Sequence, residues 1–337
     1  MNKKRVLLTG IGGSIGCHTL IHILKNTDWD VVGLDSFKHM GLTDRVYMVM
    51  REHEDLWPRL TVFQHDLKAS IADILSKEIG HIDYIINMAS RSDVDNSIVD
   101  PENFIMDNVQ STITMLEYAR KAKPQAFIQI STDEVYGPSG EFGAHKEWSA
   151  LIPSNPYSAS KACQEVIAIS YWRCFGVPVI ITNTMNNFGE MQQPQKFPSM
   201  VQKKVAKGET VIVHGTKTKI GSRFYLHSRN FADALVFLLN KKAPYMHKEG
   251  EVDRPDRYNI VGDKRIYNLE LAQLIAKLMK KPLKYKLVDF HKTRPGHDRH
   301  YGLDGTKLAD LGWKSPISFE ESMKQTIAWQ KRHQQWL

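Results

Sequence analysis

Three reactive side chains stand in a row directly after an apolar run in the middle of the chain. Residues 127–130 predict a short buried strand. Thr132, Asp133 and Glu134 follow it, where a parallel strand ends. Open α/β sheets bind their ligands at that edge, so these side chains are candidates to act on a ligand. A neighbouring acid and base are what an elimination beside a carbonyl group requires.

A tyrosine and a lysine one helical turn apart form a second candidate group. Tyr157 and Lys161 fall in a segment that starts with Asn155-Pro156, a typical helix beginning, and ends before Gly176. This spacing puts both side chains on one face of the helix. We expect the Lys161 ammonium to lower the pKa of Tyr157, which makes the phenol a usable base, and to hold a nicotinamide ribose. The two groups together indicate redox chemistry joined to an elimination.

The elements that must position these groups begin at the N-terminus. Residues 5–9 predict a first strand and residues 14–26 a helix, with a glycine-rich turn between them. Such glycines permit a tight turn, a close approach to a pyrophosphate and close helix–strand packing, and the helix start offers free N–H groups to phosphate. The residues expected at this dinucleotide-binding turn are Gly10, Gly13, Ser14, Ile15 and Gly16.

An acid ends the second predicted strand, which covers residues 30–34. Asp35 lies about 20 residues past the glycines, where a carboxylate accepts hydrogen bonds from the adenosine ribose and repels a 2′-phosphate. NAD rather than NADP is therefore the predicted cofactor. A third strand is expected over residues 60–67, with Asp66 and Leu67 bordering the adenine. A simple helix N-cap is nearly as good an interpretation of Asp66.

The remaining strands complete the predicted architecture. Residues 84–89 and 177–181 predict two more strands, and the small Ala89 permits close approach of the cofactor. The strand count fits an α/β fold with a doubly wound parallel (Rossmann) sheet. We expect the NAD-binding domain to span residues 1–182. A smaller C-terminal α/β lobe, residues 183–337, is expected to bind substrate, with some segments returning to the first domain.

Three further helices are predicted outside the candidate site, and the first carries side chains with two possible roles. The helix that begins at Asp100-Pro101 has an apolar stripe that is either core or a subunit interface, and its Asn108 either organises the site or is simply solvated. Residues 268–279 and 319–329 predict two further helices. The apolar stripe consists of Ile105, Val109, Ile113 and Leu116.

The composition restricts the range of functions. The chain has 337 residues, 42% of them hydrophobic, and a formal net charge of +8. Because the charge is spread without a basic block, we expect a phosphorylated small molecule rather than nucleic acid. No apolar run is long enough to cross a membrane, so no membrane association is expected. Cys17, Cys163 and Cys174 form no paired or metal-spaced set, which predicts packing roles, no metal site and a cytoplasmic location.

These motifs together resemble the extended short-chain dehydrogenase/reductase family, specifically its nucleotide-sugar 4,6-dehydratases of the dTDP-glucose type. The resemblance runs nearly end to end. Related 4-epimerases usually lack the adjacent Asp-Glu pair. The matching segments are Thr9-Gly10-x-x-Gly13-x-x-Gly16, Tyr157-x-x-x-Lys161, Ser131-Thr132-Asp133-Glu134-Val135-Tyr136-Gly137, Arg294-Pro295-Gly296-His297-Asp298-Arg299-His300-Tyr301 and Leu311-Gly312-Trp313.

The resemblance implies a role for each catalytic candidate. Tyr157 takes the proton of the sugar C4 hydroxyl, whose oxygen Thr132 hydrogen-bonds, while hydride passes from C4 to NAD. Glu134 removes the C5 proton that the C4 ketone has acidified, and Asp133 protonates the leaving C6 hydroxyl. Return of hydride to C6 gives a 4-keto-6-deoxy sugar. Since each turnover restores NAD, the cofactor is expected to stay bound.

The resemblance also implies contacts with the nucleotide diphosphate. A homodimer through the helices of residues 101–122 and 156–175 is expected as well. Residues 91–97 depart from the pattern usual in the family, so the hexose stays open. Phe224, Asn230 and the basic loop of residues 216–220 depart as well, so the nucleotide base also stays open. The implied substrate-binding residues are Asn186, Lys196, Arg223, Asn259, Arg294 and His297.

Other functions are compatible with the same motifs. A 4-epimerase uses the same redox pair, and a related dehydratase eliminates across C5–C6 without releasing a ketone. A non-catalytic NAD-sensing protein is an alternative of a different class. The intact Tyr157–Lys161 pair with Asp133 and Glu134 favours an enzyme.

Overall fold

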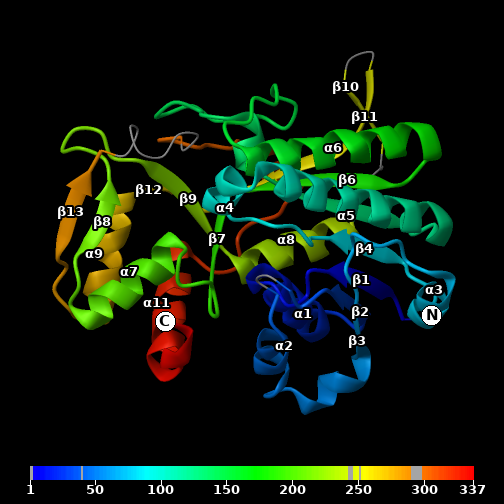
Figure 1. Ribbon diagram of the computed structural model, residues 1–337, viewed down its shortest axis with the longest axis horizontal. Coiled ribbons are helices and arrows are strands. Elements are labelled where there is room, and N and C mark those ends of the chain that lie inside the picture. The colour runs from blue at the N-terminus through cyan, green and yellow to red at the C-terminus, as the bar shows by residue number, and fades with distance from the viewer. Residues whose placement is uncertain (1–2, 39–40, 242–245, 250–251, 290–297) are drawn as a thin grey trace.

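The computed structural model describes residues 3–38, 41–241, 246–249, 252–289 and 298–337 (Figure 1). The strands of its large sheet are β1 (Arg5–Thr9), β2 (Asp30–Asp35), β3 (Leu60–Gln64), β4 (Tyr84–Asn87), β5 (Ala126–Thr132), β6 (Val179–Thr184), β10 (Met246–Glu249) and β11 (Val252–Ile260). They lie in the order β10-β11-β6-β5-β4-β1-β2-β3, and all pairs are parallel except β10 with β11. The predicted doubly wound parallel sheet is confirmed.

Helices cover both faces of this sheet because successive strand residues point to opposite faces. On β1, Val6 and Leu8 belong to one apolar core and Leu7 to another. The first core includes side chains of α1 (Ser14–Asn26) and α8 (Ser228–Asn240), and the second includes those of α5 (Pro101–Ala122) and α6 (Pro156–Phe175). The shorter helices of this part are α2 (Thr43–Met50), α3 (Asp73–Ile79) and α4 (Val94–Val99).

The last parallel strand comes from late in the sequence. β11 pairs with β6, with Asp256 opposite Ile180 and Asn259 opposite Asn183. Helix α8, which precedes β11, packs on α1 in the core on one side of the sheet. The parallel sheet is therefore completed by a strand that follows β6 only after the elements from β7 to α8.

A second, smaller group of elements lies on the opposite side of the molecule from β1–β3 (Figure 1). It contains a three-stranded sheet and a parallel strand pair, and three helices supply most of its separate apolar core. The strands are β7 (Asn186–Phe188), β9 (Ser222–His227) and β12 (Arg265–Tyr267), with β8 (Val211–His214) paired to β13 (Tyr285–Val288). The helices are α7 (Phe197–Lys207), α9 (Asn268–Met279) and α11 (Phe319–Arg332). A short helix, α10 (Thr306–Asp310), lies between α9 and α11 in the sequence.

Several element bounds agree with the prediction, whereas β3 ends at Gln64 and β4 at Asn87, earlier than the predicted residues 67 and 89. The first strand, the first helix and the helix of residues 268–279 have the predicted bounds. Strand β6 begins at Val179 and continues to Thr184, although the sequence predicts an end at Ile181. Its last residues are polar but buried, because β5 and β11 pair with them on both sides. Burial of that kind is invisible to a local hydrophobic pattern.

The cysteines fit the prediction only in part. Cys17 is buried, whereas Cys163 and Cys174 are exposed, so a packing role applies to the first alone. All three thiols are free. Across the described residues, no helix is both long and apolar enough to cross a bilayer. The same residues contain no group of three or more acidic, His or Cys side chains able to hold a metal.

Candidate active site

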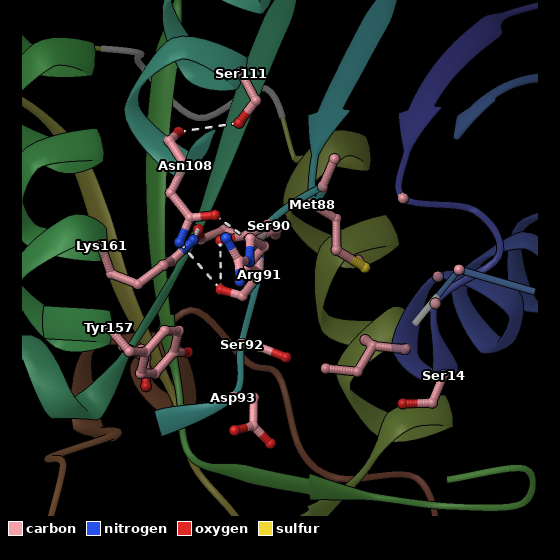
Figure 2. Close-up of a pocket in the computed structure, with 18 of the residues that line it drawn as sticks. Ser14, Met88, Ser90, Arg91, Ser92, Asp93, Asn108, Ser111, Tyr157 and Lys161 are labelled. Carbon is pink, nitrogen blue, oxygen red and sulfur yellow. Dashed lines mark hydrogen bonds between the residues drawn. The ribbon is translucent and has the colours of Figure 1, made fainter. Parts of the chain in front are cut away.

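A cavity of about 390 Å³ opens at the carboxyl edge of the parallel strands. It lies where the strand order reverses between β1 and β4, the usual ligand position in a doubly wound sheet. Figure 2 shows Tyr157 and Lys161 on one side and Ser14 on the other, with the residues that follow β4 between them. Both candidate groups therefore face one cavity.

The structure brings most of the predicted site residues to this cavity, but not all. Among the described residues, Arg223 and Asn259 are not part of its wall, while Arg294 and His297 lie outside the described residues. The predicted residues that line it are Gly10, Gly13, Ser14, Ile15, Gly16, Asp35, Asp66, Leu67, Ala89, Thr132, Asp133, Glu134, Tyr157, Lys161, Asn186 and Lys196.

The glycine turn leaves no room for side chains. Gly10 has a φ of +73°, and a Cβ on it would lie 3.0 Å from the Cα of Ala89. A Cβ on Gly16 would lie 2.0 Å from the carbonyl oxygen of Gly10. Helix α1 begins here without a side-chain cap and without an acid in its first turn. Its first N–H groups are thus available to an anion, which fits the pyrophosphate of a dinucleotide.

Two acids border the far end of the cavity. Asp35 accepts hydrogen bonds from the N–H groups of Gly12 and Phe37, each at 2.9 Å. Burial raises the pKa of Asp35, and these backbone N–H groups oppose the rise. Asp66 accepts a hydrogen bond from the N–H of Lys68 at 3.1 Å and caps no helix. The alternative interpretation of Asp66 as a helix N-cap is therefore wrong.

A short polar chain fixes the floor of the cavity between the turn and the catalytic group. The hydroxyl of Thr9 donates to Asn87 at 3.0 Å, and the amide of Asn87 donates to Gln129 at 2.9 Å. The Thr9 oxygen also accepts the N–H groups of Met88 and Ala89. Three neighbouring strands are thus joined at their carboxyl ends, which holds Ala89 in place.

Asn108 organises backbone near the site and is not solvated. It is 1% exposed, and its oxygen accepts the N–H of Arg91 at 2.7 Å. Its amide nitrogen donates to the carbonyl of Arg91 at 3.0 Å (Figure 2). The same nitrogen donates to the hydroxyl of Ser160 at 2.8 Å. The segment after β4 is thereby fixed to α6 between Tyr157 and Lys161.

Lys161 lies on α6, and its buried side chain reaches the end of β5. Its ammonium donates to the carbonyl oxygen of Ile130 at 2.6 Å. Burial lowers the pKa of Lys161 to about 8, although the charge of Glu165 opposes that shift. The side chain is therefore held by the catalytic strand as well as by its own helix.

Tyr157 does not have the lowered pKa that its spacing from Lys161 predicts. Burial raises the pKa of the phenol, the charges of Glu134 and Asp133 raise it further, and a hydrogen bond with Thr132 opposes them. The expectation is wrong for this structure because burial and the two acids disfavour the phenolate, while the Lys161 ammonium is bound to the carbonyl of Ile130. In this state the phenol is held in its protonated form.

The two adjacent carboxyl groups have different surroundings. Asp133 is 4% exposed, and one of its oxygens accepts the Thr132 hydroxyl at 2.9 Å. Its Oδ2 has no hydrogen-bond partner within the described part of the chain. Burial, together with the charge of Glu134, raises the pKa of Asp133 to about 7. Glu134 is only partly buried and accepts a hydrogen bond from Asn155 at 3.2 Å.

Two predicted substrate residues are engaged elsewhere. The amide nitrogen of Asn259 donates to the carbonyls of His145 and Asp304, at 2.9 and 3.0 Å, and the residue is fully buried. The guanidinium of Arg223 donates to the carbonyl of Asp298 at 2.7 Å. Neither residue is part of the cavity wall, although the charge of Arg223 still acts on Asp133, so contact of Arg223 and Asn259 with substrate stays a prediction.

A buried network behind the catalytic strand was not predicted. Asn183 donates to the carbonyl of Thr132 at 3.1 Å and to Glu165 at 2.7 Å. Glu165 forms an ion pair with Arg257 at 2.5 Å, and both side chains are almost completely buried. The spacing of Glu165 from Lys161 on one helix face is a signal for the acid. No local pattern predicts its partner, which lies on β11.

The Rossmann sheet and its turn place the chain in the extended short-chain dehydrogenase/reductase class, as the sequence predicts. A family model described as GDP-mannose 4,6 dehydratase matches residues 7–326. The chain belongs to this family of nucleotide-sugar dehydratases.

Individual relatives cover nearly the whole chain. The low-salt glycan biosynthesis protein Agl12 of Haloferax volcanii is 33% identical over 96% of this chain and 97% of its own length. The dTDP-glucose 4,6-dehydratase of Salmonella typhimurium is 31% identical over 99% of this chain and 94% of its own. The crystal structure of DesIV, the dTDP-glucose 4,6-dehydratase of Streptomyces venezuelae, contains NAD and superposes with a TM-score of 0.85, 30% identity and 98% coverage of both chains. The predicted resemblance is confirmed.

Proposed function

We propose that this chain is an NAD-dependent nucleotide-sugar 4,6-dehydratase, a hydro-lyase. Its reaction converts a hexose carried on a nucleoside diphosphate, of the dTDP- or UDP-glucose type, to the 4-keto-6-deoxyhexose. The observation that carries the proposal is the carboxyl pair at the end of β5, where a buried Asp133 with an unpartnered oxygen, within the described residues, adjoins the more exposed Glu134. Full-length similarity to dTDP-glucose 4,6-dehydratases supports it.

The residues present fit NAD as the resident cofactor. Gly10 and the start of α1 would hold the pyrophosphate, Asp35 the adenosine ribose and Lys161 the nicotinamide ribose. A carboxylate at the adenosine end disfavours the extra phosphate of NADP. NAD, when bound, supplies a two-electron oxidation of the sugar and the matching reduction that restores the cofactor.

The side chains of this site would carry out four proton transfers in each turnover. Tyr157 acts after it has lost its own proton: the phenolate takes the proton of the C4 hydroxyl, and the hydrogen bond with Thr132, which opposes the raised pKa of this phenol, favours that state. The C4 ketone makes the C5 proton acidic, and Glu134 removes it. Asp133 gives its proton to the C6 hydroxyl, which leaves as water. Glu134 then returns a proton to C5 when C6 is reduced, and the proton that Tyr157 took passes to solvent while Asp133 takes one back, which restores both groups.

The proposal is tested with purified protein and a panel of nucleotide sugars. Incubation with dTDP-glucose, UDP-glucose and GDP-mannose should yield a 4-keto-6-deoxy sugar from at least one, detected by its absorbance in alkali and by mass. Solvent deuterium at C5 without a lasting ketone would identify a C5–C6 dehydratase instead, and inversion at C4 an epimerase. No change in any substrate would favour a non-catalytic NAD-binding protein.

The proposal includes a cytoplasmic homodimer that pairs through α5 and α6. Exposed apolar side chains on these helices support it, since Met106 is 58% and Val166 57% exposed. Cys163 is also exposed, three positions from Val166 along α6. A second copy is the proposed partner because α5 and α6 lie side by side and each carries an exposed apolar side chain. The free cysteines support a reducing compartment.

A further inference from the structure

Asn155 is the residue that precedes α6, and it is 7% exposed. Its side-chain oxygen accepts the N–H of Ser158 at 2.9 Å, and the Ser158 hydroxyl accepts the N–H of Asn155 at 3.1 Å. This reciprocal pair is a capping box that satisfies free donors at the helix start. Tyr157 lies within the same first turn, so the cap of Asn155 fixes the backbone position from which the phenol side chain extends.

The orientation of the Asn155 amide follows from its two neighbours. Only the amide oxygen can accept the N–H of Ser158, so the amide nitrogen must point the other way. There it donates to the carboxylate of Glu134 at 3.2 Å. A flipped amide would put an N–H against an N–H and an oxygen against a carboxylate. One side chain therefore joins the helix of Tyr157 to the carboxyl group that follows β5.

We propose that Asn155 is a positioning residue for the elimination, holding the Glu134 carboxylate in the orientation that removes the C5 proton of the sugar. The inference rests on the proposed function. C4 and C5 are bonded to each other, so the groups that take their protons must keep a fixed separation. Asn155 fixes the position of Tyr157 through the cap on its helix, and it fixes the Glu134 carboxylate through a hydrogen bond.

Asn155→Ser separates these two tasks. Serine is as good an N-cap as asparagine, so α6 and Tyr157 should be unchanged, but its hydroxyl is too short to reach Glu134. In single turnovers with NAD and the active nucleotide sugar, oxidation at C4 should keep its rate. Exchange of the C5 proton with solvent deuterium should slow about tenfold, because this factor corresponds to the usual free-energy contribution of a hydrogen bond to a charged group. Reduced nicotinamide should then accumulate, visible by its near-ultraviolet absorbance.

Asn155→Asp is the matched control, since aspartate also caps the helix but places a negative charge beside Glu134. Its C5 exchange should be slower than that of Asn155→Ser. In a Glu134→Gln background, Asn155→Ser should cause no further loss, because the interaction is already altered. Thermal unfolding of each variant checks that the fold is kept. Additive losses in the double variant, or equal slowing of C4 oxidation and C5 exchange in Asn155→Ser, would overturn the inference.

The two proposals fail in different ways. If the unaltered protein forms no keto sugar from the panel, the proposed function is wrong. If the unaltered protein forms it and Asn155→Ser matches it in C5 exchange without accumulating reduced nicotinamide, only the role of Asn155 is wrong.

Discussion

Asp133 and Glu134 are neighbours in the sequence but differ in solvation. Asp133 is enclosed and lacks a partner for one oxygen among the described residues, whereas Glu134 is partly exposed and bound by the amide of Asn155. Burial disfavours a charged carboxylate, and a donated hydrogen bond favours it. Two carboxyl groups with opposite surroundings can serve as acid and base at the same pH. The assignment of roles within the pair therefore has a basis in the structure.

The elimination should depend on pH through Asp133. Its pKa lies near 7, and the reaction needs the protonated form, so the rate of water loss should fall as the pH rises through about 7. Asp133→Asn should abolish this decline and lower the rate on the order of 100-fold. Single-turnover formation of the keto sugar across the pH range measures both. A decline that persists in Asp133→Asn would assign it to another group.

The same carboxyl group should make stability depend on pH. The pKa of Asp133 rises from 3.8 to about 7 on folding, so the folded state binds the proton more tightly than the unfolded chain does. The free energy of unfolding is therefore reduced progressively as the pH rises between these values. Asp133→Asn should raise the melting temperature at about pH 8 and leave it nearly unchanged at about pH 3. Equal shifts at both pH values would contradict this linkage.

At the scale of elements, a buried ion pair joins β11 to α6. Arg257 on β11 and Glu165 on α6 are both withdrawn from water, and Asn183 connects Glu165 to the backbone of Thr132. The strand that closes the sheet thus also supports the strand that carries the carboxyl pair. Removing one charge of a buried pair leaves the other without compensation.

Arg257→Met should therefore destabilise the fold by about 3–5 kcal/mol, as read from urea unfolding. The double variant Arg257→Met with Glu165→Gln should recover part of that loss, because no charge then stays unpaired. A single-variant loss below about 1 kcal/mol would show that water or another group takes the place of the arginine.

The exposed residues Cys163 and Val166 form a stripe on α6 that should be an interface. Val166→Glu places a charge on it and should convert the proposed dimer to a monomer, as measured by light scattering. The matched control is Ile74→Glu, which alters an apolar side chain 74% exposed on α3, away from that stripe. Loss of the dimer in both variants, or in neither, would contradict pairing through α5 and α6.

At the scale of the whole molecule, the sequence predicts what is fixed locally. Apolar period and turn chemistry predict the first strand, the glycine turn and helix Ser14–Asn26, because each depends on neighbours in the chain. The same logic gathers the residues of the cavity, since the ends of parallel strands meet at one edge. No sequence pattern predicts the hydrogen bond between Asn155 and Glu134, because the helix cap alone explains an asparagine at position 155.

Long-range contacts account for what the sequence does not predict. Asn259 and Arg223 are engaged by backbone carbonyls of segments far along the chain. The pKa of Tyr157 depends on its burial and on Glu134, Asp133 and Thr132, which tertiary packing brings to it. Arg257 meets Glu165 across 92 positions of sequence. Each of these depends on tertiary packing rather than on spacing.

The late arrival of β11 has a consequence for synthesis on the ribosome. Until residue 260 leaves the exit tunnel, β6 has an open edge of unpaired backbone groups, and Glu165 lacks its counter-charge. A nascent chain that stops before β11 should therefore be a substrate for chaperones and proteases rather than a folded half-protein. Translation must deliver the second half before the first can become a stable nucleotide-binding unit.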